Sequence, residues 1–109
     1  MSKYLLIESR DPFESRDTEF LEQTVTDLKE RGHEVMVFLV QNGVLAARSK
    51  ARESYLGRLV KAGVTLLADD FSLSERGIEN AEMHPGIQPS GIEALVDALV
   101  SEKTKAIWH

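Results

Sequence analysis

The sequence predicts an α/β fold, a flavodoxin-like three-layer α/β/α sandwich with a mainly parallel sheet of four or five strands. Short apolar or β-branched runs alternate along the chain with segments whose apolar residues recur every three or four positions. Short loops that contain glycine join many of these segments. This alternation favours right-handed β–α–β crossovers, which place parallel strands between helices on both faces of a sheet.

Four segments are expected to be buried strands, because each is apolar or β-branched and is bounded by polar or turn-forming residues. They cover residues 4–8, 34–40, 63–68 and 105–108. The side chains expected in the core are Leu5, Ile7, Val35, Val37, Leu39, Val64, Leu66 and Ile107. A short fifth strand is predicted at residues 82–84, directly before Pro85 and Gly86.

Two helical regions are expected between the first three strands. Residues 20–28 carry apolar side chains at helical spacing, and Gly32 follows as the kind of residue that commonly ends a helix. A second region runs from about residue 44 to 62, with a break expected at 49–52. Its first residues, 44–47, are apolar on more than one helical face, which predicts that the protein associates through surplus apolar surface there.

The last two helices are predicted from capping boxes, in which a serine and a glutamate three residues later bond each other's backbone N–H groups. Ser72 with Glu75 opens a short helix, and Ser90 with Glu93 opens a helix over residues 92–102. Together these elements account for residues 1–109 as one domain, a size at which a chain folds around its own core.

The composition excludes several classes of function. The chain has 18 Asp and Glu against 13 Lys and Arg, a net charge of -5, so its field would repel nucleic acid and anionic lipid. The apolar run at residues 4–7 is too short for a signal-peptide core or a membrane span, and we expect a cytoplasmic location. The absence of cysteine removes disulfides, thiolate nucleophiles, iron–sulfur clusters and thiolate zinc sites.

A binding site is expected at the carboxyl ends of the strands, where ligands bind in open parallel sheets. The candidate residues that follow the predicted strands are Glu8, Arg10, Asn42, Gly43, Asp69, Asp70 and His84. The ligand classes considered for this rim are a flavin, a nucleotide and an anionic metabolite.

Five of these candidates also have structural explanations, and for these five the structural explanation is favoured. Asn42 and Gly43 form a pair that is typical of a turn with positive φ. Asp69 and Asp70 are a candidate carboxylate pair for acid–base chemistry or a divalent cation, but aspartates before a helix more often stabilise its N-terminus. His84 is a candidate base or metal ligand, but a solvated loop histidine is the commoner case.

No metal, cofactor or catalytic residue is expected. The histidines, His33, His84 and His109, show no ligand spacing such as H-x-x-x-H. The loop after the first strand has no glycine that would let a phosphate approach the backbone, and Ser9 and Ser15 are interpreted as helix caps rather than as contacts to an FMN phosphate. No G-x-S-x-G motif provides a hydrolase nucleophile.

Three segments carry a resemblance to a known family. Residues 37–47, VFLVQNGVLAA, contain a hydrophobic strand that ends in a polar pair followed by Gly-Val. Residues 62–78, AGVTLLADDFSLSERGI, end in Arg-Gly-Ile, and residues 104–109 form a short closing strand that contains Trp108. In their order and spacing they resemble the second strand, the third strand with its signature helix, and the closing strand of the DsrE/DsrF/DsrH (TusD/TusC/TusB) sulfur-relay family.

The resemblance places Asp69 where sulfur-carrying members have a cysteine, eight residues before the glycine of the Arg-Gly signature, here Gly77. A carboxylate cannot replace the thiolate that persulfide transfer needs. The resemblance therefore implies a non-catalytic accessory or docking subunit associated with intracellular sulfur trafficking. As partners it implies a second copy or related DsrE-type subunits, with a sulfur-carrier protein as a further candidate. The alternative hypothesis is a small-molecule binding protein or enzyme that uses the rim described above.

Overall fold

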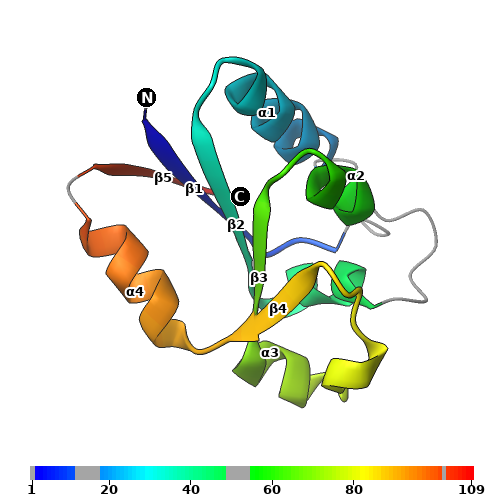
Figure 1. Ribbon diagram of the computed structural model, residues 1–109. Helices are drawn as coiled ribbons and strands as arrows, with labels where there is room; N and C mark the ends of the chain where they lie inside the picture. The colour runs from blue at the N-terminus through cyan, green and yellow to red at the C-terminus, as the bar shows by residue number, and fades with distance from the viewer. Residues whose placement is uncertain (1, 12–17, 49–54, 102) are drawn as a thin grey trace.

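The computed structural model describes residues 2–11, 18–48, 55–101 and 103–109. At its centre is one sheet of five parallel strands: β1 (Lys3–Glu8), β2 (Glu34–Leu39), β3 (Thr65–Asp69), β4 (Ile87–Ser90) and β5 (Thr104–Trp108) (Figure 1). The predicted parallel sheet is confirmed, and four of its strands lie within two residues of their expected positions.

Helices cover both faces of the sheet, as the three-layer prediction requires. On one face lie α1 (Thr18–Glu30), the 3₁₀ helix η1 (Gln41–Ala47) and α2 (Tyr55–Lys61), and on the other lies α4 (Ile92–Val100) (Figure 1). The short α3 (Asp70–Glu75) and the 3₁₀ turn η2 (Asn80–Glu82) connect β3 to β4. Within the described residues, no helix combines the length and the apolarity that crossing a membrane demands.

The strands stand in the order β4-β3-β2-β1-β5. From β1 the chain steps outward one strand at a time to β4, and it then returns through α4 to add β5 on the far side of β1 (Figure 1). The strand order therefore reverses between β1 and β5. The carboxyl ends of these two strands occupy the kind of position at which open parallel sheets bind ligands.

Alternation along the strands divides the core between the two faces. Leu6 of β1 packs with α1 and α2, whereas Leu5 and Ile7 pack with α4. Of the side chains predicted for the core, Ile107 is partly buried and all the others are buried. Because burying one such side chain contributes about 1.5–3 kcal/mol, these positions supply much of the driving force for folding.

The edge strand next to β3 differs from the prediction. Residues 82–84 do not form a ladder strand: Met83 makes only an isolated antiparallel bridge to Arg48, and β4 begins at Ile87. Ile87 sets the residue at which β4 begins, because its side chain is buried and its backbone pairs with Leu66 of β3. Pro89 is tolerated within β4 because the strand lies at the edge of the sheet.

Both predicted capping residues are wrong, although α4 begins at Ile92 as predicted. The N-cap of α3 is Asp69, whose side chain accepts from the backbone of Ser72, so Ser72 lies inside the helix. The N-cap of α4 is Gly91, which has no side chain to cap with, and the hydroxyl of Ser90 donates to the carbonyl of Gly91 instead. The N-cap is the last residue of the preceding strand in α3, and it is the residue directly after the preceding strand in α4.

The apolar segment at residues 44–47 is not the outward surface that the sequence predicts. It belongs to η1, in which Val44, Ala46 and Ala47 are buried in the core of this same chain. The break expected at 49–52 lies outside the described residues. Surplus apolar surface lies on α4 instead, at side chains that are 45% to 72% exposed: Ile92, Val96, Leu99 and Val100.

Gly43 sets how closely η1 approaches the sheet. A Cβ atom at this position would lie 2.3 Å from the carbonyl oxygen of Glu8, and a backbone atom cannot move aside as a flexible side chain can. We therefore expect Gly43→Ala to lower the free energy of unfolding by about 1–3 kcal/mol through overpacking. Urea unfolding followed by circular dichroism measures the change.

Gly57→Ala is the matched control, because Gly57 lies in α2 and a Cβ there meets nothing closer than the Nε2 atom of His84 at 4.0 Å. This variant should keep or raise the free energy of unfolding, by up to about 1 kcal/mol from helix propensity. Equal losses in the two variants would contradict the role given to Gly43.

Candidate functional site

The first group of polar residues lies where β3 ends and α3 begins. Asp69 is the last residue of β3 and the N-cap of α3, and it is 8% exposed. Its Oδ2 atom accepts hydrogen bonds from the backbone N–H of Ser72 at 3.0 Å and from the Ser72 hydroxyl at 2.7 Å. The carboxylate thus caps the helix, which agrees with the structural interpretation of this residue.

The hydroxyl of Ser72 connects this carboxylate to the loop after β2. While it donates to Asp69, it accepts a hydrogen bond from the backbone N–H of Gln41 at 2.9 Å. Gln41 has a φ of 51°, a left-handed conformation that residues other than glycine rarely adopt. The loop after β2 and the start of α3 therefore hold each other in place.

Asn42 and Arg76 form the outer part of the same group. The Arg76 guanidinium donates to Asn42 Oδ1 from Nε at 3.2 Å and from Nη2 at 3.0 Å. Its Nη1 atom also donates to the carbonyl of Ser72 at 3.2 Å. Asn42 and Asp69 of the predicted rim are thus connected through Ser72 of α3 and through Arg76, the C-cap of α3. The rim prediction did not include these two residues.

Asp70 and His84 do not join this group. Asp70 is exposed at the first position of α3, so the structure favours capping by Asp69 over a carboxylate pair. His84 precedes β4 and lies at the amino end of that strand, because the strand predicted at 82–84 is absent. Among the described residues, no three His, Cys, Asp or Glu side chains are arranged to hold a metal ion.

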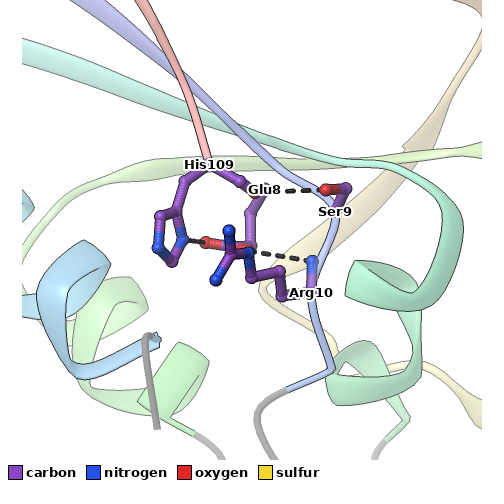
Figure 2. A network of polar contacts seen from close by, with 4 residues as sticks. All are labelled: Glu8, Ser9, Arg10 and His109. Carbon is purple, nitrogen blue, oxygen red and sulfur yellow. Dashed lines mark hydrogen bonds and ion pairs between the residues drawn. The ribbon is translucent and has the colours of Figure 1, made fainter. Parts of the chain in front are cut away.

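The second group of polar residues lies where β1 and β5 end side by side (Figure 2). Glu8 is fully buried, and its Oε2 atom lies 2.6 Å from Nδ1 of His109. Its Oε1 atom accepts a hydrogen bond from the backbone N–H of Arg10 at 2.9 Å. Both carboxylate oxygens are therefore engaged, as the burial of a charged group requires.

Backbone contacts fasten His109 in this position. Ser9 donates to the His109 carbonyl through its N–H and through its hydroxyl, each at 3.1 Å, and the His109 N–H donates to the carbonyl of Ile7 at 2.8 Å. The Ser9 hydroxyl is thus occupied by the backbone. It stabilises the end of β5 instead of facing outward as a nucleophile.

Strand register is the signal that would have identified His109. β1 and β5 pair up to Ile7 with Trp108, so the next residues, Glu8 and His109, lie at the same level and on the same face. A search for local histidine spacing misses this pair, because the two residues are 101 positions apart in sequence.

The two groups share one stretch of backbone. The carbonyl of Glu8 accepts from the N–H of Val40 at 3.0 Å, and the N–H of Gly43 donates to the carbonyl of Val40 at 2.9 Å. The predicted rim is therefore continuous from Glu8 through Gly43 to Asp69. A cavity of about 220 Å³ beside Lys3 opens at the opposite, amino ends of the strands and contains none of these three residues.

Comparison with known proteins identifies one matching family and similar solved structures. The model of the DsrE/DsrF-like family matches residues 2–104. The ychN protein from E. coli has a TM-score of 0.84 at 17% identity, with 98% of this chain and 100% of that chain covered. A protein of unknown function from Methanobacterium thermoautotrophicum, MTH1491, has a TM-score of 0.81 at 19% identity, with 98% and 97% covered. No curated protein matches significantly. At these identities the two solved structures show a shared fold.

The Asp69 cap should make a measurable contribution to stability. We expect Asp69→Ala to lower the free energy of unfolding by about 1 kcal/mol or more, because α3 loses its N-cap and the buried Ser72 loses a partner. Asp69→Asn keeps an acceptor oxygen and should lose less. Urea unfolding compares both with Asp70→Ala, an exposed neighbour whose removal should cost no more than about 0.5 kcal/mol. A loss at Asp70 as large as that at Asp69 would contradict the cap assignment.

Proposed function

The chain belongs to the DsrE/DsrF-like family, and from this membership we propose that it is a non-catalytic accessory or docking subunit associated with intracellular sulfur trafficking. One observation carries the proposal. At the end of β3, where the resemblance places the cysteine of sulfur-carrying members, this chain has Asp69, and its 109 residues include no cysteine.

The chemistry of Asp69 supports a structural role. Persulfide transfer needs a thiolate that attacks a sulfane sulfur and holds it covalently, and a carboxylate forms no equivalent bond. The Asp69 carboxylate instead accepts both donors of Ser72 and caps α3. This chain thus has a helix-capping carboxylate and no thiol at this position, as expected of a subunit that binds partners and does not carry sulfur.

Association is the proposed way in which the chain acts, either with a second copy or with related DsrE-type subunits. The exposed apolar side chains of α4 support this proposal, because contiguous apolar surface of this kind marks interaction sites. Trp108 of β5 adds to the same face of the sheet and is 66% exposed. A sulfur-carrier protein is the further partner that family membership suggests, and the cytoplasm is the expected location.

A second candidate function, a small-molecule binding protein or enzyme, is favoured by one observation. The buried carboxylate of Glu8 and the partly buried imidazole of His109 form a pair at the point where the strand order reverses. Such a pair is a common element of proton-transfer sites. It does not depend on Asp69, so the two candidate functions can be tested separately.

Asp69→Cys is expected to accept sulfur, whereas the native chain is not. The N–H and hydroxyl of Ser72 would donate to the new thiolate, so the pKa of the thiol should fall below its ordinary value of ~8.5. Each protein is incubated with glutathione persulfide, and intact-mass spectrometry looks for an added sulfur atom.

Asp70→Cys is the matched control for this experiment, because its side chain is exposed and lies one residue beyond the cap. It should react more slowly than Asp69→Cys. Labelling of the native chain would refute the non-carrier proposal. An Asp69→Cys thiol with an ordinary pKa, no faster than the control, would remove the support for Asp69 as the carrier position.

Association through α4 is tested by light scattering. The native protein should give a mass that is a multiple of 12.2 kDa at micromolar concentration, and Val96→Glu should shift that mass toward 12.2 kDa by placing a charge in the apolar interface. Gln23→Glu, exposed on α1, should leave the mass unchanged. A native mass of 12.2 kDa throughout, with no related chain recovered from lysate, would count against association.

A further inference from the structure

The histidines differ in what their Nδ1 atoms do. Nδ1 of His33 accepts a hydrogen bond from the backbone N–H of Ser2 at 3.2 Å, and Nδ1 of His84 accepts one from the backbone two residues later at 3.1 Å. A nitrogen that accepts carries no proton, so the neutral forms of these rings carry it on Nε2. Nδ1 of His109 faces a carboxylate, which accepts hydrogen bonds, so in the neutral ring the proton lies on Nδ1 and Nε2 is unprotonated. Of these histidines, His109 alone is held in the form whose Nε2 atom is a base.

The surroundings of Glu8 fix this arrangement. Its Oε1 atom already accepts from the N–H of Arg10, so Oε2 is the atom that receives the Nδ1 proton of His109 (Figure 2). Glu8 is fully buried, and its charge therefore acts on the imidazole ring with little screening by water. A carboxylate placed in this way orients the ring and stabilises it once Nε2 has gained a proton.

Two aromatic residues complete the surroundings. The ring of Phe20 on α1 lies 5.5 Å from the ring of His109, centroid to centroid, and Phe20 is 56% exposed, so it offers a flat apolar wall. The buried hydroxyl of Tyr55 has no hydrogen-bond partner within the described part of the chain. Burial first, and then the charges of Glu8 and Glu22, raise the pKa of Tyr55, so its hydroxyl stays protonated and able to donate.

We propose that Glu8 and His109 form a proton-transfer site for a small, flat weak acid that binds beside Phe20 where β1 and β5 end. The X–H bond of the ligand breaks, its electron pair stays on X, and the proton forms an N–H bond with Nε2 of His109. The Glu8 carboxylate stabilises the imidazolium. Because the Ser9 hydroxyl is bonded to the backbone, it does not serve as a nucleophile, and the described part of the site suits proton transfer. This inference rests on the second candidate function and not on the sulfur-related one.

The test uses the full chain and a flat probe with one acidic C–H group, 5-nitrobenzisoxazole. A base removes that proton, the C–H electron pair forms a nitrile, and the N–O bond breaks to give a coloured phenolate, with no further reactant. We expect the native protein to accelerate this elimination at least about tenfold more than His109→Gln, a threshold that lies below the ~10²–10⁴-fold that positioned general bases typically contribute. His84→Gln should be as active as the native chain.

A ligand-free measurement separates catalysis from structural support. Long-range ¹H–¹⁵N correlation spectra should show His109 protonated on Nδ1, and His33 and His84 protonated on Nε2. In Glu8→Gln the amide oxygen takes the N–H of Arg10, so the amide nitrogen donates to Nδ1 and the proton of His109 moves to Nε2. The elimination activity should then fall to that of His109→Gln although circular dichroism shows both variants folded.

Two results would overturn the proposal: a native protein no more active than His109→Gln, or a native His109 protonated on Nε2. If Glu8→Gln fails to fold, the native spectrum and the His109→Gln comparison still decide the matter. Neither measurement involves Asp69. Failure here would leave the accessory-subunit proposal standing, and sulfur labelling of the native chain would leave this proposal standing.

Discussion

The close approach of η1 to the carboxyl end of β1 is the constraint on which both groups of polar residues depend. The chain can turn directly over the carbonyl of Glu8 because Gly43 has no side chain, and the N–H of Val40 bonds to that same carbonyl. This turn directs the N–H of Gln41 to Ser72. It also covers the end of β1, from which the Glu8 side chain reaches His109. The contact between the backbone of Glu8 and the backbone of the turn at Gly43 thus positions both groups of polar residues.

The two buried carboxylates on this rim differ in the partners that satisfy them. Asp69 accepts two donors from Ser72, a residue of the helix that it caps, so its hydrogen bonds are local and stabilise the start of α3. Glu8 accepts from a backbone N–H and faces an imidazole ring from the other end of the sequence. A neutral imidazole ring presents one donor and one acceptor nitrogen, whereas a backbone amide N–H only donates. For this reason the Asp69 carboxylate is suited to a structural role, and the Glu8 carboxylate is suited to proton transfer.

Strands and core positions are predictable from the sequence because each strand is a short apolar or β-branched run between polar or turn-forming residues, a pattern that each segment shows by itself. Local rules fail where a neighbour decides. Ser72 fits a capping box. Asp69 is nevertheless the N-cap of α3, because β3 ends at Asp69, the last residue that pairs with β4. The apolar residues of η1 suggest an outer surface, yet the turn at Gly43 places them in the core. His109 joins the site because β5 lies beside β1. The order of strands in a sheet cannot be predicted from any local sequence pattern.

The position of β5 at the margin of the sheet gives the two polar groups different lifetimes in the native state. Edge strands open at a lower free energy than central ones, and all five side chains of β5 are at least partly exposed. When β5 detaches, His109 leaves with it, while the contacts among Gln41, Ser72 and Asp69 remain with β2 and β3. The same order holds on the ribosome. Glu8 emerges 101 residues before His109, so the pair forms only after β5 has docked beside β1.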